Sequence, residues 1–198
     1  LIEKPIALTW ADAKAMKAAV DKAGVKTLVG YVLRWNPLFV NAKKMQEQYL
    51  GRLYYAETDY FHRVTEEYPC YDWTVRKDVG GSSLLAGGCH AVDAIRWFMQ
   101  DEVVEVYALS SKSRTDLEFD GTLTALLNNK LYSPQEILEQ NDYVHLPVTT
   151  PDSGDVTHHN FPEEINHFID CIMHAKKCIV GLDDAMKTQE VVFAADLS

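Results

Sequence analysis

Three short stretches of this sequence hold residues that could carry out chemistry, and the first is Glu3-Lys4-Pro5. We expect it at the end of a strand, and a lysine at the carboxyl end of a parallel strand faces the crevice where α/β proteins bind ligands. Its ammonium could polarise a substrate hydroxyl and stabilise the alkoxide that forms as a hydride leaves. A lysine is more often a solvated surface charge, so three residues leave both interpretations open.

The second stretch runs from Gly80 to Asp93 and combines two glycine pairs, an imidazole and a carboxylate. The small residues at 86–88 would let a ligand or another backbone come close. His90 and Asp93 are three residues apart, so on a helix they share a face and could act as general base and orienting carboxylate. The alternative is a half-buried histidine beside a glycine contact between helices.

The third stretch runs from His158 to His167. Glu163 and His167 are four residues apart on a predicted helix, and histidine with carboxylate is a donor set that suits Zn²⁺ or Fe²⁺. No HExxH element is present, however, and carboxylates at a helix start are also favoured by the positive end of the helix dipole. We therefore assign no metal ligands.

The elements that must position these residues begin with a strand, a helix and a second strand, which is the pattern of a parallel α/β unit. Thr9 is a good N-cap for the helix, and Gly24 is a good C-terminal stop. Residues 26–32 are mostly apolar and rich in β-branched side chains, so they predict a buried strand.

Further helices and strands follow from apolar periodicity and turn residues. We expect helices after Asn36-Pro37, from about Leu84 to Met99, after Pro162 and after an Asp183 or Asp184 cap, and strands at 52–62, 103–110 and 122–127. The helix after Pro162 has a predicted buried stripe of Ile165, Phe168, Ile169 and Ile172. The signal is weak between residues 128 and 155, where prolines and a Ser-Gly pair interrupt it.

Charge and cysteine content exclude some function classes. The 198 residues contain 19 Lys and Arg against 29 Asp and Glu, a net charge of −10, which disfavours nucleic acid as a partner. Apolar runs are too short for a membrane span, so we expect no membrane contact. The four cysteines form no CxxC pair and predict free thiols in a reducing compartment, the cytoplasm. We expect both ends of this sequence to be truncated.

Taken in order, these segments resemble the Gfo/Idh/MocA family, the glucose–fructose oxidoreductase and inositol dehydrogenase group. Glu3-Lys4-Pro5 is similar to the family's EKP motif, and residues 30–37 (GYVLRWNP) are similar to the segment that follows it. The stretch from Gly80 to Asp93 resembles the motif that carries the family histidine, and residues 155–168 resemble a late helical segment. The match covers most of the chain, and the ordered set is more specific than any one piece.

The resemblance implies an α/β fold with two parts. Residues 1–33 would be the last β-α-β unit of a Rossmann dinucleotide-binding domain. Residues 34–198 would be an α+β C-terminal domain for substrate binding and oligomerisation, built on a large, mostly antiparallel sheet with flanking helices. The sheet face would join copies of the chain into a homo-oligomer.

The resemblance also implies a function, which is hydride transfer from a sugar or cyclitol hydroxyl to NAD or NADP. Lys4 would hold and acidify the reacting hydroxyl, and His90 would take its proton. By the same resemblance, the cofactor would contact Glu3, Lys4 and Pro5, and the sugar or polyol substrate would contact Arg34, Trp73, Asp93 and His159.

Three departures from the family pattern leave alternatives open. No GxGxxG turn follows a strand, so the phosphate-binding turn is missing from this chain. Ala86 stands where the family usually has an aspartate, four residues before the histidine. Leu127 leads almost directly into the 128–132 segment, so strands would be lacking there and an edge left unpaired. The alternatives are an NAD-dependent glycosidase-type enzyme and a non-catalytic sensor or oligomerisation module, which Ala86 favours.

Overall fold

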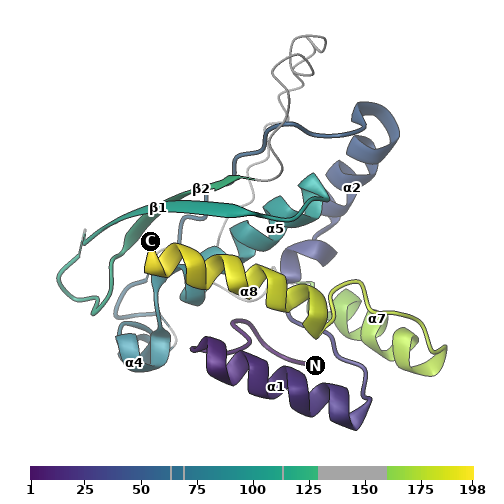
Figure 1. Ribbon diagram of the computed structural model, residues 1–198, viewed down its shortest axis with the longest axis horizontal. Helices are drawn as coiled ribbons and strands as arrows, with labels where there is room; N and C mark the ends of the chain where they lie inside the picture. The colour runs from purple at the N-terminus through teal and green to yellow at the C-terminus, as the bar shows by residue number, and fades with distance from the viewer. Residues whose placement is uncertain (63, 69, 113, 129–159) are drawn as a thin grey trace.

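Helices dominate the part of the chain that the computed structural model describes, residues 1–62, 64–68, 70–112, 114–128 and 160–198. The α-helices are α1 (Trp10–Ala23), α2 (Pro37–Met45), α3 (Tyr71–Thr74), α4 (Lys77–Gly80), α5 (Cys89–Met99), α7 (Phe161–Met173) and α8 (Leu182–Leu197). A 3₁₀ turn, η1 (Val32–Trp35), and two π-helical turns, η2 (Gln46–Leu50) and η3 (Leu84–Gly88), complete them. Helix α8 crosses the middle of the molecule, with α1 on one side and α5 and the strands on the other (Figure 1).

The sheet of the described residues has two antiparallel strands, β1 (Glu105–Ser111) and β2 (Thr122–Asn128). Both strands were expected, but the prediction of a large sheet is wrong for the described residues. The alternating segment 52–62 is extended without joining the sheet, because alternation makes a strand only where a neighbour supplies ladder hydrogen bonds. Most of the weak 128–155 segment lies outside the described residues.

The expected strand–helix–strand unit at the start of the chain is reduced to one parallel bridge between Ile2 and Val29. Ile2 N–H donates to the Leu28 carbonyl at 2.8 Å, and Gly30 N–H donates to the Ile2 carbonyl at 2.9 Å. The second strand ends there, since Tyr31 N–H turns back to the Val29 carbonyl and η1 begins one residue later. The pairing is parallel as predicted, and it is much shorter than the 26–32 strand that the sequence suggests.

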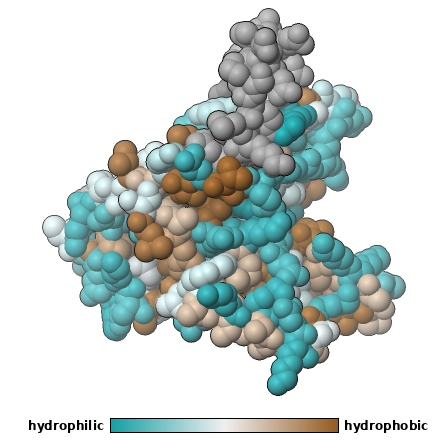
Figure 2. All heavy atoms as spheres, in the orientation of Figure 1, coloured by the Kyte–Doolittle hydropathy of each residue, from teal (hydrophilic) through white to brown (hydrophobic). Residues whose placement is uncertain are grey.

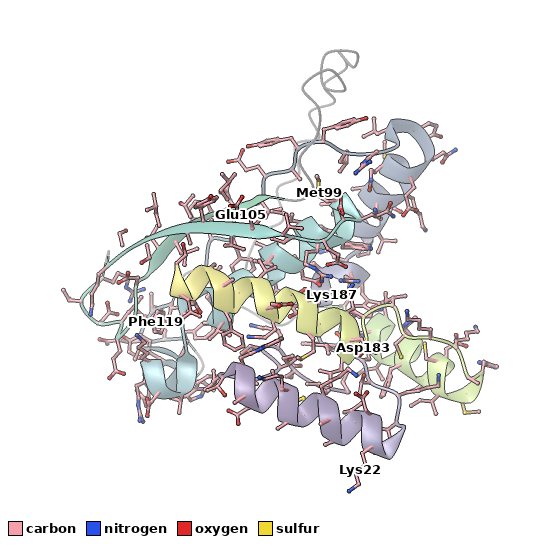
Figure 3. The ribbon with its side chains drawn as sticks, viewed as in Figure 1. Lys22, Met99, Glu105, Phe119, Asp183 and Lys187 are labelled. Atoms are coloured by element: carbon pink, nitrogen blue, oxygen red, sulfur yellow. The ribbon has the colours of Figure 1, made fainter. Side chains whose placement is uncertain are left out.

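Helix α1 begins and ends as its sequence predicts. The Thr9 hydroxyl accepts the Asp12 N–H at 3.1 Å, and Gly24 takes a left-handed conformation (φ 63°) that suits a residue without Cβ. Lys22 lies in the last turn and extends away from the molecule (Figure 3), where a positive charge suits the negative end of the helix dipole. Helix α2 is also capped as expected, with the Asn36 side chain accepting the Leu38 N–H at 3.0 Å.

Two sequence expectations about the last helices are wrong. Gly181 is the N-cap of α8, and Asp184 lies inside its first turn together with Asp183 (the latter labelled in Figure 3). On α7 the isoleucines of the predicted buried stripe are 44 to 52 % exposed, whereas Glu164 and Cys171 are the buried residues. Periodicity finds an apolar face but does not say which neighbour covers it, and η1 packs on the other side of α7.

One hydrophobic core joins both ends of the chain. It includes Ile6 and Leu28 from the first residues together with Val180, Leu182 and Val192 from the last. Hydrophobic residues also reach the surface in patches among hydrophilic ones (Figure 2). The described residues contain no helix that is both long and apolar enough to cross a membrane.

We predict that Thr9→Ala lowers the free energy of unfolding by about 1 kcal/mol, because the first turn of α1 loses its side-chain acceptor. Urea denaturation followed by circular dichroism measures the change. Thr9→Ser keeps the hydroxyl and serves as the control. An alanine variant as stable as the serine variant would contradict the role of the cap.

Candidate active site

Lys4 lies half-buried at the end of the short bridge and points its ammonium at the turn that leads into α5. Its Nζ donates to the Ala86 carbonyl oxygen at 2.7 Å. The peptide bond to Pro5 is cis. Ala86 lies one helical turn before His90, so the structure brings the lysine to the segment that carries the histidine. The main chain at position 86 holds the ammonium where the family pattern has a carboxylate.

His90 is buried in the first turn of α5 and is enclosed by aromatic rings. It is 3 % exposed, with the Tyr31 ring edge-on at 6.0 Å and the Tyr60 ring stacked at 5.8 Å between centroids. Gly87 makes room for this stack, since a Cβ there would lie 2.7 Å from Cε1 of Tyr60. The close approach that the glycines predict therefore exists, and a tyrosine ring makes it.

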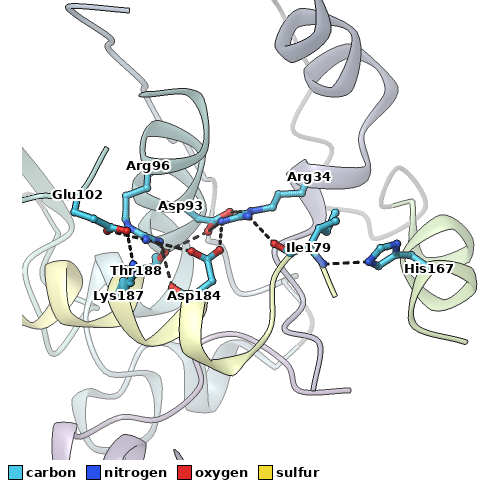
Figure 4. Close-up of polar contacts among 9 residues, drawn as sticks. All are labelled: Arg34, Asp93, Arg96, Glu102, His167, Ile179, Asp184, Lys187 and Thr188. Carbon is cyan, nitrogen blue, oxygen red and sulfur yellow. Dashed lines mark hydrogen bonds and ion pairs between the residues drawn. The ribbon is translucent and has the colours of Figure 1, made fainter. Parts of the chain in front are cut away.

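Asp93, one turn beyond His90, belongs to a buried ion pair with Arg34. Nε and Nη2 of Arg34 donate to the two carboxylate oxygens of Asp93 at 2.8 and 2.7 Å (Figure 4). The Thr188 hydroxyl donates to the same carboxylate at 3.2 Å. Asp93 is 1 % exposed and Arg34 7 %. The sequence interpretation that Asp93 orients His90 does not fit these bonds, because i, i+3 spacing does not show which partner a carboxylate faces.

The same ion pair extends to α8. Arg34 Nη2 also donates to Asp184 at 2.6 Å, and Arg96 on α5 bonds the Thr188 hydroxyl at 2.8 Å and Glu102 at 3.0 Å (Figure 4). One cluster of alternating charges thus fastens η1, α5 and α8 together. The position of His90 depends on it, because His90 and Asp93 lie on the same helix.

Burial shifts the pKa values of groups in this region. It raises the pKa of Asp93, and the hydrogen bonds and charge of Arg34 oppose that rise. For Arg34 burial acts to lower the pKa, but Asp93 and Asp184 raise it overall. Burial also raises the pKa of the Cys89 thiol to about 11, so this neighbour of His90 stays a thiol at neutral pH.

The other residues predicted for the site are less closely grouped. Glu3 is exposed and Pro5 half-buried next to Lys4. Trp73 is 51 % exposed in α3, and its hydrogen bonds within the described residues are local backbone bonds. His159 lies outside the described residues.

The third stretch shows no metal centre where it is described. His158 lies outside the described residues. Nε2 of His167 accepts the Ile179 N–H at 3.2 Å (Figure 4) and lies 3.4 Å from the Cys171 sulfur, while Glu163 is exposed. Among the described residues no group of three or more His, Cys, Asp and Glu side chains could hold a metal ion.

Sequence reasoning missed Tyr31, Tyr60 and Glu164. Tyr60 could have been found from the alternation of 52–62, which places Tyr60 and His62 on one side of an extended chain, and their rings stack at 6.1 Å. Tyr31 lies within residues 30–37, the segment that is similar to the family stretch following the EKP motif. Glu164 falls on the glutamate position of the F-x-x-E-x-x-H-F pattern that the late segment resembles, and this signal could have distinguished it from Glu163.

Residues 40–130 match the family model described as the GFO/IDH/MocA C-terminal domain. The chain carries a Gfo/Idh/MocA C-terminal domain. It is distantly similar to D-xylose 1-dehydrogenase (NADP(+)) 2 of Haloferax volcanii, with 25 % identity over 144 residues, 68 % of this chain and 43 % of that protein. The chain thus spans less than half the length of this curated relative.

Solved structures share the fold of this chain over nearly all its length. The WlbA dehydrogenase from Bordetella pertussis, in complex with NADH and UDP-GlcNAcA, gives a TM-score of 0.72 at 22 % identity, covering 99 % of this chain and 67 % of its own. The aldose-aldose oxidoreductase from Caulobacter crescentus, complexed with glycerol, gives 0.67 at 21 % identity, covering 98 % and 69 %.

The residues present fit one end of a nicotinamide cofactor. The Lys4 ammonium bonds the main-chain oxygen of Ala86, four residues before His90 in the turn that leads into α5. Glu3, Lys4 and Pro5 would hold the nicotinamide end there. The sequence has no GxGxxG turn to hold the phosphates, so the rest of the cofactor would need residues that this chain does not supply.

We predict that Asp93→Ala lowers the free energy of unfolding by about 3–5 kcal/mol, because it leaves the buried Arg34 guanidinium without its bidentate partner. Chemical denaturation measures the loss. The control is Asp78→Ala, which removes the partner of the half-exposed Arg76 and should change stability by less than about 1 kcal/mol. Equal effects of the two substitutions would contradict the structural role of the buried pair.

Proposed function

We propose that this chain is the catalytic C-terminal part of an NAD(P)-dependent oxidoreductase that oxidises a hydroxyl of a sugar or cyclitol. The observation that carries the proposal is the meeting of Lys4 with the 86–90 turn that bears His90. The family match and the distant xylose dehydrogenase relative support it. The cofactor would be NAD or NADP, and a dinucleotide-binding part, of which residues 1–33 are the last unit, would complete its site.

Each residue has one task in this reaction. The nicotinamide, when bound, supplies the hydride acceptor. Lys4 donates a hydrogen bond to the reacting hydroxyl and stabilises the negative charge that develops on its oxygen. His90 accepts the hydroxyl proton as general base. The rings of Tyr31 and Tyr60 fix the imidazole plane and keep water from it.

We propose that Arg34 and Asp93 position His90 and do not contact the substrate. Their hydrogen-bonding groups are occupied by each other, by Thr188 and by Asp184. Trp73 and His159 remain proposed substrate contacts, on the basis of the sequence resemblance. Half-exposed indole rings are common in sugar sites, because their apolar faces stack on sugar rings.

The outward face of the sheet is the proposed contact between copies of the chain. Tyr107, Leu109 and Leu126 on β1 and β2 are 55, 81 and 58 % exposed. Exposed apolar groups of this kind on one face favour a protein interface. Three of the four free cysteines are buried, which fits the proposed cytoplasmic location.

The test is turnover of the protein with NAD⁺ and NADP⁺ on a panel of sugars and cyclitols. We predict that Lys4→Ala lowers kcat/KM at least about 100-fold, because the developing alkoxide loses its charged donor. His90→Ala should lower it about 100- to 10,000-fold. Lys14→Ala on exposed α1 is the matched control and should leave kcat/KM unchanged. Normal rates in the Lys4 variant would refute the assignment.

One observation favours a second candidate, a sensor or oligomerisation module without turnover. Lys4 is held by a main-chain oxygen because Ala86 offers no carboxylate. If the module does not catalyse, the wild-type protein binds cofactor or sugar without producing NAD(P)H.

We predict that Ala86→Asp raises turnover of the catalytic form, since a carboxylate beside Lys4 adds a partner for the proton that moves through the site. Measuring kcat of this variant against Ala86→Asn separates the charge from the size of the new side chain. A lower kcat in the aspartate variant would contradict the proposed proton path.

A further inference from the structure

A buried carboxyl group on α7 has no task in the proposed hydride transfer. Glu164 is 2 % exposed, and its Oε2 has no hydrogen-bond partner among the described residues. Its neighbour in the sequence, Glu163, is exposed. A carboxylate that is ionised, buried and without a hydrogen bond is costly, so the protein must either pair this group or keep it neutral.

A second carboxyl group approaches the same point. Gly30 marks that point, because a Cβ built there would lie 3.2 Å from Oε2 of Glu3 and 3.6 Å from Oε1 of Glu164. Glu3 belongs to the segment that carries Lys4, and Glu164 belongs to α7. Two acid groups from elements far apart in the sequence therefore border the space that a side chain at position 30 would fill.

The surroundings supply little positive charge to this pair. Burial and then the charge of Glu3 raise the pKa of Glu164 to about 7. Arg34 lies in η1, which packs on α7, but the ion pairs already described take up its guanidinium. His167 on α7 accepts the N–H of residue 179. None of these cationic or titratable groups is hydrogen-bonded to Glu164.

We propose that Glu164 is a positioning residue that carries a proton at mildly acidic pH and shares it with Glu3, holding the Lys4 strand end against α7. The neutral acid donates and the Glu3 carboxylate accepts, so one negative charge occupies the site. When the proton leaves at higher pH, two negative charges face each other across Gly30, and the strand end is pushed away from α7. Only the consequence for turnover rests on the proposed function.

The pH dependence of stability follows from this raised pKa. The folded protein binds the Glu164 proton more tightly than the unfolded chain, whose glutamate has the ordinary pKa of 4.5. The stabilisation is therefore complete below about pH 4.5 and is lost as pH rises through about 7.

The first experiment is thermal unfolding between pH 5 and 8.5. We expect the Tm of wild type to fall, relative to Glu164→Gln, by about 5–10 °C over this range, since glutamine stays neutral throughout. Glu163→Gln is the matched control and should follow wild type at every pH. Glu3→Gln removes the facing charge, which lowers the pKa of Glu164, and should therefore shift the fall in Tm to lower pH values.

Nuclear magnetic resonance of the glutamate carboxyl carbons gives a second, direct measurement. We expect one glutamate to titrate near pH 7, and its signal should be absent from Glu164→Gln. Parallel Tm curves for wild type and Glu164→Gln, or a Glu164 signal that titrates with the exposed glutamates, would overturn the proposal. If Glu164→Gln does not fold, the Glu3→Gln shift and the wild-type titration still decide it.

A kinetic measurement separates this proposal from the proposed function. If both hold, the alkaline fall of kcat in wild type shifts by at least one pH unit in Glu164→Gln. If the protein shows no turnover, the proposed function fails while the Tm and titration results still stand. An unchanged kcat profile in an active enzyme would refute positioning of Lys4 by Glu164.

Discussion

The buried pair between Arg34 and Asp93 is the interaction on which the rest of the structure depends. Arg34 follows directly after the short parallel bridge, and Asp93 lies one turn after His90. Through Asp184 and Arg96 the pair reaches the first turns of α8, the helix at the centre of the molecule. A charge cluster of this kind tolerates little movement, because displacement of one member leaves another as a buried charge without a partner. The spacing between the lysine segment and the histidine helix is set by this constraint.

Much of the fold could be predicted from local sequence. Thr9 and Gly24 mark α1, Asn36 marks the start of α2, and the strands expected at 103–110 and 122–127 correspond to β1 and β2. These signals are local because capping and pairing preferences act over a few residues. The prediction that the isoleucines of α7 are buried was wrong, because their exposure depends on which neighbour packs against the helix. The sequence of the helix itself does not show that neighbour.

The candidate site was predictable in its residues and less so in their partners. Lys4 and His90 were found from motif order, and the structure brings their segments together at residues 86–90. Asp93 was assigned to the imidazole, yet it binds Arg34, which is 59 residues earlier in the chain. Glu164 matches the glutamate of the late family pattern, but its burial was not predicted, since the sequence of α7 does not show which element covers it. Long-range partners therefore account for most of what the sequence did not predict.

The joint core of the two chain ends has a consequence for folding. Ile6 and Leu28 pack with Val180, Leu182 and Val192, so contacts near Lys4 close loops of well over one hundred residues. Loops of this length make folding slow, because chain entropy is lost before the contacts form. During synthesis residues 1–30 lack part of their packing partners until α8 leaves the ribosome. We expect nascent chains that end before α8 to expose this apolar segment and to require chaperones.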